Sequence, residues 1–181
     1  IKSDYPVVTK KIREDDDQDK VGNQGWNDLA DFEIGQTVPY RYESNMPDVN
    51  GYNTYYYAWH DVMSEALTFK KDSVAIRIYE SSNARNYYEL KEGEFEVKEA
   101  PGGGDTFQVV VSDMKKIIDR EFNRKNEAGE NKYGQKIVLT YQATLNEKAA
   151  KNTGRPGFEN DVRLEFSNDP DSAVRGSTGY T

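Results

Sequence analysis

The stretch YYYAWHDVM, residues 55–63, decides the fold class, because large apolar side chains recur in it at every second position. Tyr55, Tyr57, Trp59 and Met63 share one face of an extended chain, as the side-chain period of two in a β-strand requires. Asp61 falls on the same face, among side chains that we expect to be buried. The stretch therefore predicts a long strand over residues 52–63 that carries an acid into the core.

The same alternation recurs on both sides of this stretch, with turn signals rich in Gly, Pro and Asn between the segments. One segment is helical instead: Met114, Ile117, Ile118 and Phe122 form an apolar stripe behind Ser112 or Asp113, either of which can cap a helix. Roughly eight strands, one short helix and no regular strand–helix rhythm predict an all-β antiparallel sandwich. The predicted strands are 7–12, 37–43, 52–63, 73–79, one strand or two within 87–97, 107–111, 137–145 and 162–166.

Composition limits the classes of function. The chain has 181 residues, no cysteine and a formal net charge of -8, with a sequence pI near 4.8. A length of this order predicts a single domain over residues 1–181. The acidic balance argues against nucleic acid or an anionic membrane as a partner. Without cysteine there is neither a disulfide framework nor a thiolate metal site, and no apolar run reaches membrane-spanning length.

Two more polar residues fall on apolar faces. In VVTKKI, residues 7–12, Lys10 shares a face with Val8, and in GFENDVRLEF, residues 157–166, Asn160 shares a face with Val162. Burying a lysine, an acid and an amide together is costly if they remain as they are. Burial also favours the neutral amine and the protonated carboxyl, which are a nucleophile and a hydrogen-bond donor.

These three groups can react with one another. Attack of Lys10 Nζ on Asn160 Cγ would expel ammonia and leave an isopeptide bond, with Asp61 moving the protons and donating to the amide oxygen. Proximity in a rigid core can supply on the order of 7–11 kcal/mol of the barrier reduction. The bond would close a loop of nearly the whole domain, for which chain entropy gives roughly 4–5 kcal/mol. Because the reaction happens once, the chain would not be an enzyme with turnover.

The alternation of strand faces leaves alternatives open for the two reacting residues. A register slip of one residue exchanges the faces of a strand, so Lys11 competes with Lys10. Asn168 shares the face of Asn160 and is the alternative partner, although its place beside Pro170 predicts a strand end. All of these polar residues could also be strand-end residues that reach solvent, or members of a satisfied buried ion pair.

Several segments together resemble one family. VVTKKI, DFEIGQTVPYRY, YYYAWHDVMSEALTF, KIVLTYQATLNEKA and NDVRLEFSNDP are similar, in this order, to the middle domain of Gram-positive sortase-assembled backbone pilins. The resemblance implies a CnaA-type, reversed immunoglobulin-like sandwich with an autocatalytic Lys–Asn bond assisted by an acid. The family's lysine, acid and amide match Lys10, Asp61 and Asn160. The chain departs from the pattern at GSTGYT, where one more strand usually follows, so we expect that strand to be missing or supplied by sequence outside residues 1–181.

The resemblance also implies a role and a location. We expect a structural domain of an extracellular, cell-wall-anchored pilus, with other copies of the same pilin as partners and no cofactor. The alternative is an adhesin module that binds a host matrix protein through a sheet face or the loops 13–35 and 80–105. The acidic run Asp15-Asp16-Asp17-Gln18-Asp19 lacks the Gly and the terminal Glu of a calcium loop, so no metal site is predicted.

Overall fold

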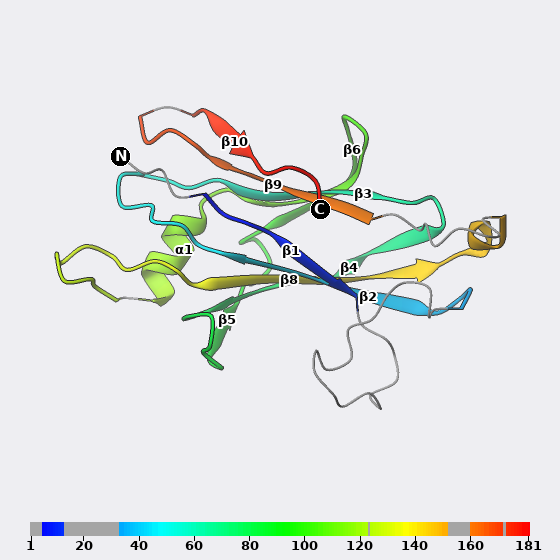
Figure 1. Cartoon of the computed structure of the whole chain (residues 1–181), viewed down its shortest axis with the longest axis horizontal. Coiled ribbons are helices and arrows are strands. Elements are labelled where there is room, and N and C mark those ends of the chain that lie inside the picture. The colour runs from blue at the N-terminus through cyan, green and yellow to red at the C-terminus, as the bar shows by residue number, and fades with distance from the viewer. Residues whose placement is uncertain (1–4, 13–32, 123, 152–159, 172) are drawn as a thin grey trace.

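The computed structural model of the chain describes residues 5–12, 33–122, 124–151, 160–171 and 173–181, without the side chains of residues 11, 12 and 151. In this part of the chain two antiparallel sheets of five strands each lie face to face (Figure 1). One short α-helix and one 3-10 helix, Glu147–Lys151, accompany them. The predicted all-β sandwich with one short α-helix is confirmed.

The first sheet contains the strand nearest the N-terminus at one edge. Its order is β1-β2-β8-β4-β5, and all of its neighbouring pairs are antiparallel. The strands are β1 (Thr9–Ile12), β2 (Thr37–Asn45), β8 (Lys136–Leu145), β4 (Leu67–Tyr79) and β5 (Tyr87–Glu89).

The second sheet contains the strand nearest the C-terminus at one edge. Its order is β10-β9-β3-β7-β6, again with antiparallel neighbours. The strands are β10 (Arg175–Ser177), β9 (Asn160–Ser167), β3 (Tyr57–Met63), β7 (Asp105–Val111) and β6 (Glu96–Gly102).

The core lies between the sheets and follows the predicted alternation. Strand β9 alternates strictly between buried and half-buried residues, and β2 does so over most of its length. Tyr40 and Tyr42 enter the core from the first sheet and meet Trp59 and Leu164 from the second, all four with no exposed surface. Burying this much aromatic and aliphatic area is the main force that holds the two sheets together.

Helix α1 (Met114–Glu121) closes one end of the sandwich, and its cap ties it to the segment before β3. Asp113, one of the two predicted caps, accepts a hydrogen bond from the backbone nitrogen of Lys116 at 3.2 Å and another from that of Tyr55 at 3.0 Å. The backbone nitrogen of Met114 donates in turn to the carbonyl oxygen of Tyr55 at 2.7 Å. The cap therefore stabilises both the helix terminus and the entry into the core.

These contacts explain why the strand predicted over 52–63 is shorter. Strand β3 begins at Tyr57, because the backbone nitrogen and the carbonyl oxygen of Tyr55 both form hydrogen bonds with the start of α1. The backbone nitrogen of Tyr52 donates to the carbonyl oxygen of Val49 in a turn at 3.0 Å. The prediction for residues 52–56 was therefore wrong, although Tyr55 is buried on the expected face.

Two other boundaries differ from the prediction. Strand β4 begins at Leu67 rather than at residue 73, and its register against β8 shifts between Lys70 and Ala75. The exposed polar residues at this irregularity interrupt the alternation of polar and apolar residues, so the sequence pattern did not predict the first part of the strand. The segment 87–97, predicted to hold one strand or two, contains β5 and the start of β6, which continues to Gly102. Between them is a turn in which the backbone nitrogen of Glu94 donates to the carbonyl oxygen of Lys91.

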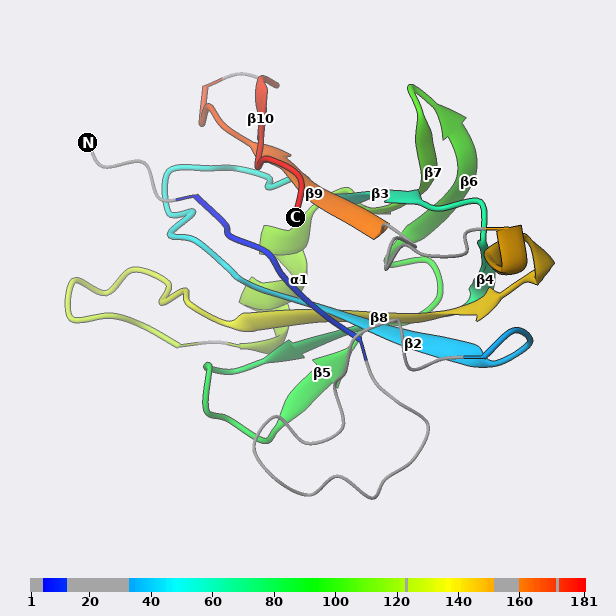
Figure 2. The ribbon, with the colours of Figure 1, turned by 45° about the vertical axis from the view of Figure 1, so that its right-hand side comes forward.

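Strand β1 and the C-terminal segment lie on the same side of the sandwich (Figure 2). Strand β10 pairs with β9, and beyond it Thr181 exchanges backbone hydrogen bonds of 2.9 and 3.0 Å with Val162. The segment after β10 therefore continues along β9 beside β1. The expected further strand beyond residue 181 stays a prediction.

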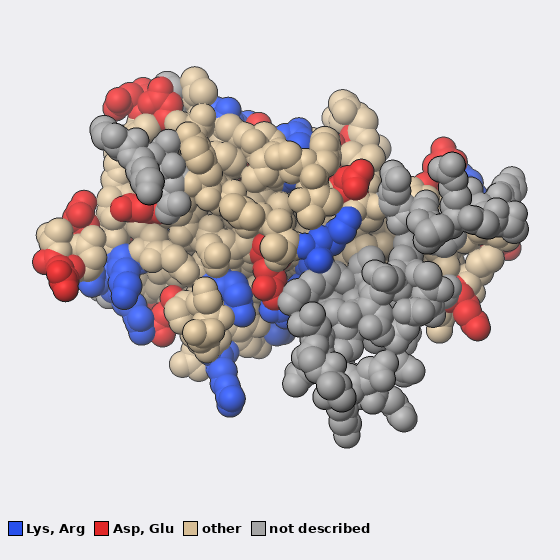
Figure 3. Space-filling view, viewed as in Figure 1, with Lys and Arg blue, Asp and Glu red and all other residues tan. Residues whose placement is uncertain are grey.

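The face seen in Figure 1 carries acidic and basic side chains that are interspersed around its margin (Figure 3). No helix in the described ranges is long and apolar enough to cross a membrane.

Candidate cross-linking site

Three strands bring the predicted residues to one place inside the sandwich. Lys10 lies opposite Tyr42 in the β1–β2 pair, and Asn160 lies opposite Met63 in the β3–β9 pair, two positions from Asp61. Asp61 has no exposed surface and Asn160 is 4% exposed, whereas Lys10 is half-buried. The amine thus enters from the edge of one sheet toward an acid and an amide held by the other.

The amine of Lys10 contacts the main chain of Asn160. Its Nζ donates a short hydrogen bond to the carbonyl oxygen of Asn160 and a second one, at 3.3 Å, to the carbonyl oxygen of Thr181. Nζ is therefore placed at the residue that the predicted bond would use. A turn of the lysine side chain is needed to bring Nζ from the main-chain oxygen toward Cγ.

Two tyrosine hydroxyls complete the site, and the sequence reasoning did not assign them to it. The hydroxyls of Tyr42 and Tyr141 lie 2.6 Å apart. Both also lie within hydrogen-bonding distance of Asp61 Oδ2, Tyr141 at 3.0 Å and Tyr42 at a shorter distance. Both residues lie in segments predicted as alternating strands, 37–43 and 137–145, and a buried tyrosine hydroxyl needs a polar partner. That requirement was the signal available in the sequence.

The carboxamide of Asn160 lies between these hydroxyls and Asp61. One of its terminal atoms is 2.8 Å from the Tyr42 hydroxyl and 2.6 Å from the Tyr141 hydroxyl. When that atom is the oxygen, it accepts from both hydroxyls, and Nδ2 donates to Asp61 Oδ1 at 2.5 Å and Oδ2 at 3.1 Å. This orientation satisfies both ends of the carboxamide, whereas the opposite one sets the amide oxygen against the carboxyl oxygens. It differs from the prediction that Asp61 donates to the amide oxygen.

The electrostatics of the site favour a protonated acid. Burial raises the pKa of Asp61 to about 7, against the lowering effects of the Tyr42 and Tyr141 hydrogen bonds and of the nearby Lys10 charge. Burial likewise raises the pKa of Tyr42 and of Tyr141 well above the ordinary value, so both hydroxyls keep their protons. Asp61 can therefore exchange a proton near neutral pH, whereas the tyrosines act as donors.

The alternative residues lie elsewhere or are not described. Asn168 is exposed and follows the end of β9, and its backbone nitrogen donates to the carbonyl oxygen of Val174 at 2.9 Å. The structure does not bring it to Asp61. Lys11 pairs with Arg41 in the backbone register, but its side chain is outside the described part of the structure, as is the acidic run Asp15-Asp16-Asp17-Gln18-Asp19.

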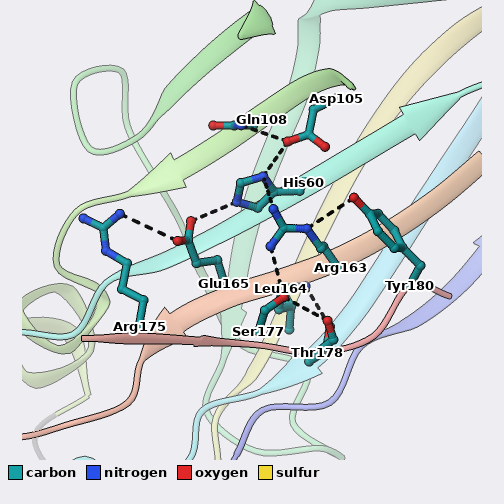
Figure 4. A network of polar contacts seen from close by, with 10 residues as sticks. All are labelled: His60, Asp105, Gln108, Arg163, Leu164, Glu165, Arg175, Ser177, Thr178 and Tyr180. Atoms are coloured by element: carbon teal, nitrogen blue, oxygen red, sulfur yellow. Dashed lines mark hydrogen bonds and ion pairs between the residues drawn. The ribbon is translucent and has the colours of Figure 1, made fainter. Parts of the chain in front are cut away.

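His60, the neighbour of Asp61 in β3, faces away from it and belongs to a separate polar network (Figure 4). Its Nδ1 lies 2.6 Å from Asp105 Oδ2 and its Nε2 lies 2.9 Å from Glu165 Oε1. Gln108 donates to Asp105 at 2.9 Å, and Arg175 lies 3.8 Å from Glu165. The network links β10, β9, β3 and β7 across the outer face and takes no part in the buried site.

Comparisons with solved structures show where this sandwich occurs. RrgB, the pilus backbone of Streptococcus pneumoniae, matches with a TM-score of 0.51 and 20% identity, over 92% of this chain and 54% of that one. The major pilin SpaD of Corynebacterium diphtheriae matches with a TM-score of 0.55 and 16% identity, over 97% and 34%. BcpA, the major pilin subunit of Bacillus cereus, matches with a TM-score of 0.53 and 18% identity, over 97% and 39%.

At these identities the likeness establishes the fold alone. The chain spans about half, or less, of the length of these solved structures. No curated protein sequence matches the chain.

The family itself is shown by sequence. Residues 34–170 match the family model of the Gram-positive pilin backbone subunit 2, Cna-B-like domain. The description is Cna-B-like, where the sequence resembled the CnaA type, but the backbone-pilin resemblance is confirmed. The matched range covers well over half of the chain and includes Asp61 and Asn160. The chain therefore belongs to the family of Gram-positive pilin backbone subunits.

Proposed function

We propose that this chain is a structural domain of a Gram-positive surface pilus and that an autocatalytic isopeptide bond between Lys10 and Asn160 stabilises it. One observation carries the proposal: a buried acid with its pKa raised to about 7 contacts the amide of Asn160, while the Lys10 amine contacts the same residue. An amine, an amide and a proton carrier are the groups that amide exchange requires.

The position of the bond suits a load-bearing fibre. It would join β1, at the edge of one sheet, to β9 in the other sheet, across 150 positions of sequence. Strands of the two sheets could then not separate under tension without breaking a covalent bond. Partners would be other copies of the same pilin in a fibre outside the cell, anchored to the cell wall.

The adhesin alternative lacks a specific supporting observation. Tyr55, Tyr57 and Trp59, which share one face of the stretch 55–63, are core residues with at most 1% exposed surface, so they do not form an exposed binding patch.

Intact mass tests the proposed bond. The purified chain should weigh one ammonia less than its sequence, and peptide mapping should place the bond between Lys10 and Asn160. Asp61→Ala should fold and regain the ammonia mass. Full mass in the folded wild-type chain would contradict the proposal.

A further inference from the structure

We infer that the hydroxyls of Tyr42 and Tyr141 form an oxyanion hole for isopeptide formation and that Asp61 protonates the leaving nitrogen of Asn160. This inference rests on the proposed function and assigns its chemical steps to individual groups. It follows from the orientation of the Asn160 carboxamide, in which the oxygen faces two phenolic donors and Nδ2 faces the carboxyl group.

The distances match those of a preformed oxyanion hole. The two hydroxyls lie 2.6 and 2.8 Å from the amide oxygen, on rings without exposed surface or nearly so. They come from neighbouring strands, β2 and β8, so the sheet fixes their separation at 2.6 Å. Donors held in a water-excluded site stabilise developing negative charge without reorganisation.

The protons balance through Asp61. Neutral Lys10 Nζ adds to Asn160 Cγ, and the negative charge that develops on the amide oxygen is held by the two hydroxyls. As the Cγ–Nδ2 bond breaks, Nδ2 takes the proton of the Asp61 carboxyl and leaves as ammonia. Nζ then gives one proton to the Asp61 carboxylate, which restores the acid and leaves a neutral amide. The step needs no other reactant.

The protonation state of Asp61 also decides whether the two hydroxyls can donate to the amide oxygen. Each hydroxyl has one hydrogen to donate, and both hydroxyls also contact Asp61 Oδ2. An ionised Asp61 draws those hydrogens to itself. A protonated Asp61 leaves them for the amide oxygen, so the hole and the general acid are complete in the same protonation state.

Tyr40 supplies a matched control in the same cluster. Its ring stacks on Tyr141 with centroids 5.0 Å apart, and it has no exposed surface. Its hydroxyl has no hydrogen-bond partner among the described residues. Tyr40→Phe thus removes a buried hydroxyl beside the site without removing a donor to Asn160.

The experiment follows ammonia loss by intact mass after a short pulse of cell-free synthesis. Tyr42→Phe and Tyr141→Phe should each slow the loss on the order of 100-fold, whereas Tyr40→Phe should keep the wild-type rate. The same three substitutions in a Lys10→Ala background, which cannot cross-link, measure their structural cost by thermal unfolding. The oxyanion hole is supported when ammonia loss slows by more than the loss of stability in the Lys10→Ala background explains.

Two outcomes would overturn the inference, and they are distinguishable. If folded Tyr42→Phe and Tyr141→Phe lose ammonia at the wild-type rate, the two hydroxyls do not act as an oxyanion hole, but the proposed isopeptide bond is not contradicted. Full mass in the wild-type chain would contradict the proposed function as well.

Discussion

The side chains of Asp61 and Asn160 meet in the closed interior of the sandwich, with Asn160 Nδ2 2.5 Å from Asp61 Oδ1. They project from adjacent strands, two positions apart in register, so the backbone pairing of β3 with β9 fixes their approach. A buried carboxyl in contact with an amide nitrogen can hold a proton where an amide bond would break.

Lys10 rather than Lys11 should supply the nitrogen of the bond. Lys10 Nζ already contacts Asn160 and Thr181, and Lys10 is the lysine that shares the apolar alternation of Val8 in the sequence. Lys10→Ala should therefore have the full sequence mass, and Lys11→Ala should keep the ammonia deficit. A deficit that survives in Lys10→Ala would reassign the nucleophile.

Asn160 rather than Asn168 should supply the carbonyl. Asn160 is buried against Asp61, while Asn168 is exposed beyond the end of β9. Asn160→Ala should regain the ammonia mass, and Asn168→Ala should weigh one ammonia less than its own sequence, as the wild type does. The reverse pattern would show that β9 is shifted in register during the reaction.

Loss of the bond should lower the stability of the folded chain. Closing a loop of 150 positions restricts the unfolded state by roughly 4–5 kcal/mol. In a domain of this size that difference corresponds to a fall in melting temperature of about 10–20 °C for Lys10→Ala. Calorimetry checks it, with Lys11→Ala as the control. Equal melting temperatures for the wild type and Lys10→Ala would show that the bond contributes no thermal stability.

The stability of the uncross-linked fold should fall as pH rises from about 4 to about 7. Burial raises the pKa of Asp61 from 3.8 to about 7, so over this range the folded chain binds a proton that the unfolded chain has released. The stabilising contribution is complete below the unfolded pKa and is lost as pH passes the folded one. Three pKa units correspond to roughly 4 kcal/mol.

This pH effect can be isolated by a pair of variants. Lys10→Ala blocks the bond, and Lys10→Ala with Asp61→Asn also removes the titrating group. Urea unfolding at several pH values should show the excess loss in the first variant alone. Parallel curves would mean that Asp61 titrates normally in the fold.

The sequence predicted the site better where strands alternate than where the backbone turns. Alternation in the sequence placed Asp61 and Asn160 among apolar side chains, and both are buried in the structure. The alternation could not show that the backbone of Tyr55 forms hydrogen bonds with the start of helix α1, nor that β4 continues through an irregular polar stretch. Both depend on contacts between distant segments, which single-sequence periodicity does not contain. The roles of the two hydroxyls depend on such contacts as well.

The network around His60 should stabilise the outer face of the sandwich without affecting the bond. Asp105 and His60 side chains are only 5% and 6% exposed, and a neutral imidazole can donate to only one of the two carboxylates that it contacts. His60→Leu removes one donor to the buried Asp105 carboxylate, which keeps the hydrogen bond from Gln108, at an expected cost of about 1–3 kcal/mol in unfolding free energy. The exposed Lys98→Ala should change stability by less than about 0.5 kcal/mol. Because His60 faces away from Asp61, folded His60→Leu should keep the ammonia deficit, and its loss there would show that the two faces of β3 are chemically coupled.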